Sequence, residues 1–322
     1  MREGPREAEY WRPGAPLASR TSQLAPLLFG MPTATAWRVR GRTLQLDRPL
    51  VMGILNVTPD SFSDGGRFFG ADAAVEQAER MAAEGADIID VGGESTRPQG
   101  ATPVSAGEEI GRVGPVLREL RRRLPDTVLS VDTVKSEVAR EALAEGAEIV
   151  NDVSGFRLDA RMAEVCAAAG AGAVLMHSRG GVSTMGTYQH AEYGQSPVDD
   201  VLTELRRAAD AALAAGLLPE SVALDPGVGF AKRSEHSLAV LGALPRLVAW
   251  GFPVVVGVSR KRFIGELTGV ATAAERVHGT VGANVAALSL GARIFRVHDV
   301  RASRQALDVA WAVLARAAGS AA

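Results

Sequence analysis

A strand-then-helix alternation, repeated eight times, is the feature that most constrains the fold of this chain. Short apolar runs recur along the sequence, and amphipathic or alanine-rich stretches with helical spacing separate them. The apolar runs fall at 50–55, 87–91, 128–132, 148–151, 173–177, 222–225, 254–258 and 293–297. The helical stretches fall at 71–84, 105–123, 135–145, 159–169, 197–215, 235–249, 274–290 and 302–317. This pattern predicts an α/β fold, a (β/α)8 TIM barrel.

The main structural alternative is a doubly wound open sheet. That fold usually has fewer strands and carries a glycine fingerprint after the first one, which is absent here. Before the barrel, residues 37–46 alternate around Arg40-Gly41, which predicts a β-hairpin that closes one end of the barrel. Residues 1–35 mix Pro, Gly, Arg and Glu without a period, so we expect a disordered extension. The remaining domain spans 36–320, with the barrel at about 50–318.

Composition excludes several function classes. A net charge of −2 gives no electrostatic basis for binding nucleic acid or an anionic membrane. The single cysteine, Cys166, excludes a disulfide framework and fits a reducing compartment. No apolar run approaches the length of a membrane span, and no apolar signal core follows the first arginines. We therefore expect a cytoplasmic protein that has neither nucleic acid nor membrane as a partner.

Polar side chains lie at or just past the carboxyl ends of the predicted strands, where TIM barrels build their active sites. A single acidic residue after a strand is usually a helix cap or a turn residue. Eight strand ends that all carry polar groups instead predict a site. The residues are Asn56, Glu94, Thr96, Arg97, Asp132, Asn151, His177, Asp225, Lys261, Arg296 and His298.

Seven ordered motifs across about residues 50–300 carry a family resemblance: GILNVTPDSFSDGG, DVGGESTRP, SVDT, NDVSG, LDPGVGF, SRK and RVHDV. In this order they resemble the dihydropteroate synthases, a pterin-binding TIM-barrel family. The resemblance implies a transferase of folate biosynthesis. It condenses 6-hydroxymethyl-7,8-dihydropterin pyrophosphate with p-aminobenzoate, giving 7,8-dihydropteroate and pyrophosphate. It also implies Mg²⁺ as cofactor and a homodimer.

The resemblance further implies a role for each matching residue. The pterin pyrophosphate would bind Thr96, Asp132, Asn151, Asp225, Lys261, Arg296, Val297 and His298. The p-aminobenzoate would bind Arg97, Pro98, Phe230 and Ser259, and Asn56 would help to hold Mg²⁺. The catalytic groups would be Arg296, His298 and Lys261. Two departures from the family pattern, Gln99 as an insertion and Ser178, bear on the shape of the p-aminobenzoate pocket.

The residue types suit this chemistry, although each has a plainer interpretation. A pterin presents adjacent N–H donors and a carbonyl, which carboxylates, an amide and an ammonium match. The alternative for Asp225 and Lys261 is a structural ion pair in the barrel mouth. The polar loops at 56–70 and 92–104 are either lids over substrate or ordinary surface loops. The arylamine is neutral near pH 7, so the displacement requires no strong general base.

Two other functions share much of this pattern. A non-synthase pterin-binding barrel, such as the folate-binding part of a corrinoid methyltransferase, would keep the carboxylates but lack the SRK and RVHDV motifs. A catalytically silent paralogue that binds pterin or a partner protein would not need the intact loop after the first strand. Both motifs and the loop are present, which favours the synthase.

Overall fold

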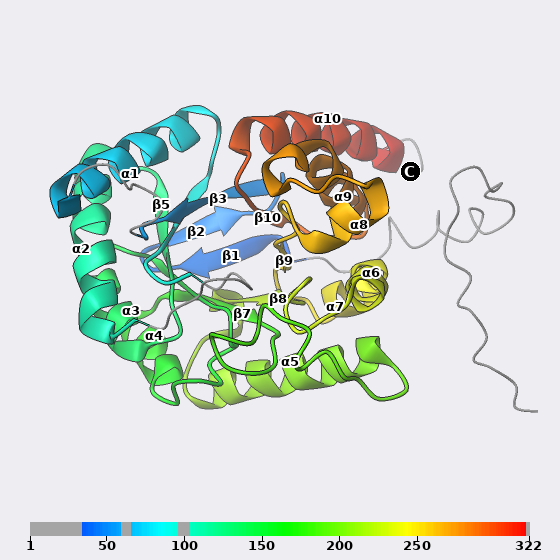
Figure 1. Ribbon diagram of the computed structural model, residues 1–322, viewed down its shortest axis with the longest axis horizontal. Coiled ribbons are helices and arrows are strands. Elements are labelled where there is room, and N and C mark those ends of the chain that lie inside the picture. The colour runs from blue at the N-terminus through cyan, green and yellow to red at the C-terminus, as the bar shows by residue number, and fades with distance from the viewer. Residues whose placement is uncertain (1–33, 59–65, 96–103, 320–322) are drawn as a thin grey trace, which may run out of the picture.

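Eight parallel strands form the centre of the molecule, and helices surround them (Figure 1). The structure is a computed structural model that describes residues 34–58, 66–95 and 104–319. The barrel strands are β3 (Leu50–Asn56), β4 (Ile88–Gly92), β5 (Val128–Asp132), β6 (Ile149–Asp152), β7 (Gly172–Met176), β8 (Val222–Asp225), β9 (Val255–Val256) and β10 (Ile294–Val297). The predicted extension, residues 1–35, lies outside the described residues except for its last two.

The sheet is a nearly closed ring whose strand order confirms the predicted (β/α)8 barrel. Hydrogen-bonded neighbours run β8-β7-β6-β5-β4-β3-β10-β9, and a parallel bridge between Leu224 and Val254 brings the two ends together. In register, Gly92 of β4 pairs with Asp132 of β5, and Asp132 pairs with Asn151 of β6. The pairing therefore places the carboxyl ends of neighbouring strands side by side at one rim of the barrel.

The helices follow the predicted stretches with shifted ends and two differences. They are α1 (Gly66–Ala83), α2 (Ala106–Arg123), α3 (Ser136–Ala144), α4 (Met162–Ala169), α5 (Pro197–Ala214), α6 (Ser234–Gly242), α7 (Leu244–Val248), α8 (Arg262–Thr268), α9 (Val277–Ser289) and α10 (Val300–Gly319). The single helix predicted at 235–249 is two helices, because Pro245 lacks an N–H and fits only the first turn of a helix. Helix α8 was not predicted; it ends at Gly269, which has a left-handed backbone.

The predicted hairpin is present and closes the amino-terminal end of the barrel. Strands β1 (Ala36–Val39) and β2 (Arg42–Gln45) pair antiparallel, and Gly41 takes a positive φ of 75° in the turn between them. Trp37 is fully buried among barrel side chains, and its indole Nε1 donates to the carbonyl of Ser221 at 3.0 Å. The hairpin thus seals the end of the barrel opposite the polar rim.

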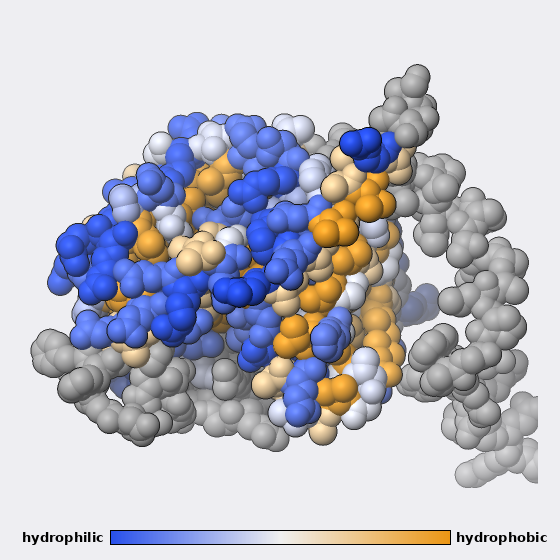
Figure 2. Space-filling view, turned by 90° about the horizontal axis from the view of Figure 1, so that it is seen from above, coloured by the Kyte–Doolittle hydropathy of each residue, from blue (hydrophilic) through white to orange (hydrophobic). Residues whose placement is uncertain are grey.

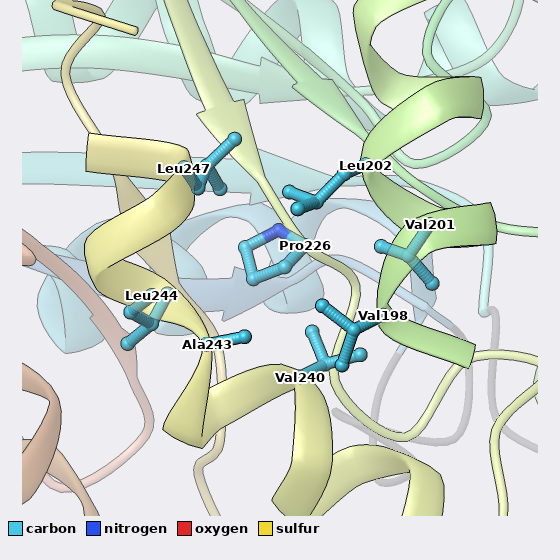
Figure 3. Close-up of a pocket in the computed structure, with 8 residues that line it drawn as sticks. All are labelled: Val198, Val201, Leu202, Pro226, Val240, Ala243, Leu244 and Leu247. Atoms are coloured by element: carbon cyan, nitrogen blue, oxygen red, sulfur yellow. The ribbon is translucent and has the colours of Figure 1, made fainter. Parts of the chain in front are cut away.

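A continuous apolar core lies between the barrel and the helices. Figure 3 shows a small pocket within this layer, between α5, α6 and α7. Pro226 and apolar side chains of these helices line it, so it offers no polar group to a ligand. In the part of the chain that the structure describes, no helix is both long and apolar enough to cross a membrane.

Candidate active site

A buried charge cluster fills the mouth of the barrel. The guanidinium of Arg296, on β10, donates through Nε to Oδ2 of Asp90 and through Nη2 to Oδ2 of Asp132, both at 2.6 Å. The carboxylate of Asp90 also accepts from Ser130 Oγ at 2.6 Å and from Asn151 Nδ2 at 2.9 Å. Two carboxylates therefore share one guanidinium, and their charges raise the pKa of Arg296 against the effect of burial.

Asp90 is the member of this cluster that the sequence interpretation missed. It lies in the middle of β4, is completely buried, and holds the side chains of three other strands in place. The signal was present, because a buried strand rarely carries a charged residue at its centre unless that residue is paired. Asp90 thus fixes the orientation of Arg296 and Asn151 in the barrel mouth.

Asp225 is a buried acid and Asp132 a partly buried one, and the fold disfavours the ionised form of each. Burial raises the pKa of Asp132 to about 7, although Arg296 opposes the shift. Burial likewise raises the pKa of Asp225, against the charge of Lys261, and Oδ1 of Asp225 accepts from the backbone N–H of Gly227 at 2.7 Å. A ligand that supplies N–H donors would compensate the cost of keeping these carboxylates charged.

Lys261 is a partly buried cation next to these acids, but it makes no direct ion pair with Asp225. Within the described residues, no oxygen of Asp225 lies within 4.0 Å of the Lys261 ammonium. Instead, Nζ of Lys261 donates to the carbonyl of Val228 and lies 4.3 Å from the centre of the Phe230 ring. Burial lowers the pKa of Lys261 to about 8. The alternative of an Asp225–Lys261 ion pair is therefore not what the structure contains.

The hydroxyl of Ser259, in the segment after β9, forms hydrogen bonds with His298, the residue after β10. The Oγ of Ser259 lies 2.9 Å from Nδ1 of His298 and accepts from the His298 backbone N–H at 3.1 Å. Next to them, Arg260 forms a bidentate ion pair with Asp299. The side chain of Val297 is fully buried in the layer under the helices, so only its backbone can face a ligand. These contacts place His298 at the rim beside the Arg296 cluster.

Three predicted site residues, Thr96, Arg97 and Pro98, lie outside the described residues, as does Gln99. Of the two departures from the family pattern, the structure describes only Ser178, whose buried hydroxyl donates to the carbonyl of Val153 at 2.7 Å. Asn56, the predicted metal ligand, ends β3 on the same rim as Asp132. The other predicted residues that the structure describes come from β5, β6, β8 and β10 and from the segments that follow β4, β7, β8, β9 and β10.

Comparison with known proteins agrees with this arrangement. Residues 52–298 match the family described as pterin binding enzyme. The dihydropteroate synthase of Mycobacterium leprae is 48% identical over 268 residues, which cover 81% of this chain and 93% of that protein. The chain belongs to the dihydropteroate synthase family.

Solved structures of dihydropteroate synthases extend the agreement to three dimensions. The Xanthomonas albilineans enzyme with 4-aminobenzoic acid has a TM-score of 0.81 and 45% identity, covering 88% of this chain and 99% of that one. The same enzyme in complex with 7,8-dihydropteroate has a TM-score of 0.78 and 42% identity, over 87% and 99% of the two chains. The barrel is thus that of a dihydropteroate synthase.

Proposed function

We infer that this chain condenses 6-hydroxymethyl-7,8-dihydropterin pyrophosphate with p-aminobenzoate to give 7,8-dihydropteroate and pyrophosphate. The observation that carries this function is the convergence of two carboxylates, a buried amide and an ammonium at one rim of the barrel. The residues are Asp132, Asn151, Asp225 and Lys261. Relatives that are 44–48% identical to this chain bear the name of this activity.

In the proposed complex, Asp225 accepts two adjacent N–H donors of the pterin ring. Its Oδ1 already accepts from Gly227, and Oδ2 lies 3.7 Å from the position that a Cβ atom of Gly257 would occupy. A glycine at that position leaves the approach to Oδ2 free of a side chain. Asn151 serves a mixed donor and acceptor edge, and Lys261 donates to the pterin carbonyl.

The pyrophosphate binds Arg296 and His298 at the end of β10. Because Arg296 is held by Asp90 and Asp132, its guanidinium keeps one orientation while charge develops on the leaving oxygens. The bond from the pterin methylene carbon to the pyrophosphate oxygen breaks, and the oxygen leaves with the electron pair. The arylamine nitrogen then forms the new C–N bond and releases a proton to water.

We propose that Asn56 helps to hold Mg²⁺ on the pyrophosphate. The amide Oδ1 of Asn56 and Oδ2 of Asp132 lie 3.8 and 3.7 Å from the position that a Cβ atom of Gly92 would occupy, so two oxygen acceptors flank this glycine. Among the described residues, no group of three His, Cys, Asp or Glu side chains forms a cage for a metal. This donor set fits an ion that keeps waters and shares substrate phosphates, and when bound it would neutralise charge on the leaving group.

We also propose that two copies of the chain associate through the face that α9 and α10 form. Val309 and Val313, one turn apart on α10, are 67% and 63% exposed. In Figure 2 an apolar stripe runs over this side of the molecule.

A cytoplasmic location would suit this reaction and the single free cysteine, Cys166.

The dimer is tested by the double variant Val309→Glu/Val313→Glu, measured by analytical ultracentrifugation. We expect the wild type to sediment as a dimer and the variant as a monomer. The control is Leu218→Glu, which places the same charge on another exposed apolar residue, one that precedes β8. A monomeric wild type would exclude the proposed dimer.

The activity is tested with purified protein, Mg²⁺, the dihydropterin pyrophosphate and p-aminobenzoate. Dihydropteroate and pyrophosphate should form in equal amounts, and chelation of Mg²⁺ should slow the reaction. Binding of the pterin without product would identify a silent paralogue instead. Transfer of a methyl group from a folate to a corrinoid, without dihydropteroate formation, would identify a methyltransferase module.

A further inference from the structure

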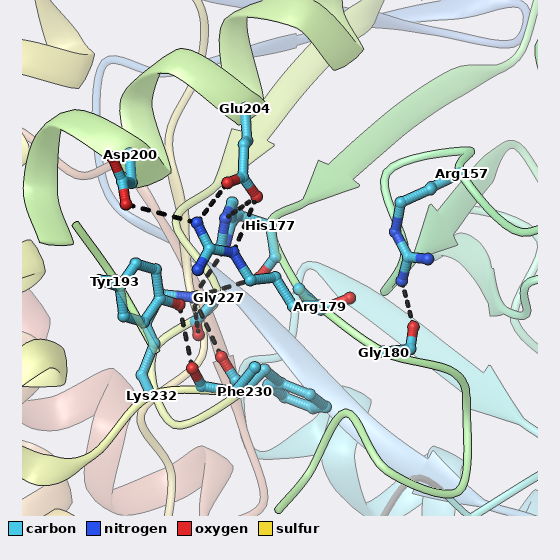
Figure 4. Close-up of polar contacts among 12 residues, drawn as sticks. Arg157, His177, Arg179, Gly180, Tyr193, Asp200, Glu204, Gly227, Phe230 and Lys232 are labelled. Atoms are coloured by element: carbon cyan, nitrogen blue, oxygen red, sulfur yellow. Dashed lines mark hydrogen bonds and ion pairs between the residues drawn. The ribbon is translucent and has the colours of Figure 1, made fainter. Parts of the chain in front are cut away.

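A fully buried lysine lies next to the proposed site, and none of the steps above uses it. Lys232, in the segment between β8 and α6, is 1% exposed. Its Nζ atom lies 2.7 Å from His177 Nδ1, 3.0 Å from the carbonyl oxygen of Gly227 and 3.1 Å from that of Phe230 (Figure 4). A buried amine is costly unless hydrogen bonds satisfy it, so this arrangement requires a structural or functional reason.

The hydrogen-bond count identifies the proton positions. Four acceptors surround this amine, since the carbonyl oxygen of His177 also lies 3.4 Å from Nζ, so every donor of Lys232 finds a partner although burial lowers its pKa. Nδ1 of His177 then accepts, and Nε2–H donates to Oε2 of Glu204 at 3.0 Å. Burial and the nearby Lys232 lower the pKa of His177 to about 4, which keeps the imidazole neutral.

Tyr193 and Met185 form hydrogen bonds with the backbone of Ala231, in the segment that Lys232 also contacts. Tyr193 donates its hydroxyl to the carbonyl of Ala231 at 3.0 Å, and the Ala231 N–H donates to the carbonyl of Met185 at 2.7 Å. Ala231 has a φ of 47°, a left-handed conformation that costs energy for a residue with a side chain. The hydrogen bonds of its N–H and of its carbonyl hold Ala231 in this conformation.

The opposite side of this segment faces the proposed substrate site. Lys261 donates to the carbonyl of Val228, and its ammonium lies against the ring of Phe230. Residues 227–231 therefore lie between two lysines, of which the partly buried Lys261 faces the site and the buried Lys232 lies behind the segment. Lys232 accounts for the carbonyls of Gly227 and Phe230, so it determines where the Phe230 backbone stands relative to Lys261.

We propose that Lys232 is a positioning residue for the p-aminobenzoate half of the reaction, holding Phe230 against Lys261 so that the aromatic substrate meets a preformed pocket. This inference rests on the proposed function. Asp132 and Asn151 come from other strands, and Asp225 touches the segment only through the Gly227 N–H, so we expect pterin binding to depend less on Lys232. Without the hydrogen bonds from Lys232, residues 227–231 can adopt several conformations. Part of the binding free energy of p-aminobenzoate is then spent on ordering this segment, so the affinity for p-aminobenzoate falls.

The test is Lys232→Met, which keeps the length of the side chain and removes its donors. Initial rates are measured while each substrate is varied with the other saturating. We expect the KM for p-aminobenzoate to rise about tenfold or more, and the KM for the dihydropterin pyrophosphate to change less than about threefold. A variant that merely lost stability would lose active protein, which lowers the apparent kcat and leaves both KM values unchanged.

A milder variant covers the case in which Lys232→Met does not fold. Tyr193→Phe removes only the hydroxyl that holds Ala231, and we expect it to raise the same KM about threefold. The control is Val116→Ala on α2, across the barrel from this segment in Figure 1. It should lower the melting temperature and leave both KM values unchanged.

Each outcome decides the inference. Folded Lys232→Met or Tyr193→Phe with an unchanged KM for p-aminobenzoate would overturn it, as would an equal rise in both KM values. A wild-type protein that makes no dihydropteroate would instead refute the proposed function. The two failures are distinguishable, because the first appears only in variants and the second appears before any variant is made.

Discussion

Replacing Asp225 with Asn is the sharpest test of the proposed pterin site, because the change keeps the size of the side chain and alters only its donors. The carboxylate offers acceptors alone, whereas the amide offers one oxygen and one NH₂ group. The Asn oxygen can still accept from the Gly227 N–H, which Asp225 Oδ1 accepts at 2.7 Å in the wild type. The NH₂ group then points at the position where a ligand N–H donor is expected.

The size of the effect follows from the contacts. One hydrogen bond from the pterin to the side chain is lost. In addition, the NH₂ group of the Asn faces an N–H donor of the pterin in a buried site, so neither donor has an acceptor. Each unsatisfied group costs about 1–3 kcal/mol, and more where a charge took part. The sum corresponds to about a hundredfold loss of pterin affinity or more. Stability should change little, because no Asp225–Lys261 ion pair within 4.0 Å occurs among the described residues.

The direction of the stability effect is also fixed. Burial raises the pKa of Asp225, which means that the folded chain disfavours the charged carboxylate. A neutral Asn removes that penalty at pH 7, so the melting temperature should stay the same or rise. Calorimetric titration with pterin and a thermal melt check both quantities. If the variant retains its affinity for pterin, with or without a large fall in melting temperature, Asp225 is not a pterin-binding residue.

Two further predictions concern pH and the closed end of the barrel. Burial raises the pKa of Asp132 to about 7 in the folded chain, whereas an Asp carboxyl in the unfolded chain has a pKa of about 4. Between these two pH values Asp132 is protonated in the folded chain and ionised in the unfolded chain. Its contribution to the free energy of unfolding should therefore fall as pH rises from about 4 to about 7, and denaturant titrations of Asp132→Asn should lack this slope. Trp37→Ala should cost about 3–5 kcal/mol in urea denaturation, because it empties a buried site, while both KM values of the folded fraction stay unchanged.

Much of the fold was predictable because the barrel depends on patterns that are local in sequence. Buried parallel strands appear as apolar runs, and each must be followed by a helix that returns the chain to the other end. The hairpin was predictable from alternation around Arg40-Gly41. The break at Ala243 between α6 and α7 was also readable, since Pro245 cannot continue a helix, but the apolar periodicity masked it.

The positions of most site residues were predictable for the same reason, since each lies at the end of a run that the pattern defines. Which groups touch was not predictable, because contacts across the barrel depend on strand order and register. Arg296 lies 206 residues from Asp90 in sequence, and only the pairing of β10 with β3 and of β3 with β4 brings them together. No local pattern encodes that distance.

Lys232 shows the limit of sequence interpretation most clearly. In the stretch Ala231-Lys232-Arg233-Ser234 it looks like a solvated surface residue, and lysines are rarely buried. Its environment is created by a neighbouring strand, because His177 comes from the end of β7 and supplies the third acceptor. An amine that the fold buries next to the substrate segment must be satisfied there, and two of the groups that satisfy it are carbonyls of the segment itself, those of Gly227 and Phe230. The same two hydrogen bonds therefore help to satisfy the buried Lys232 and to position Phe230.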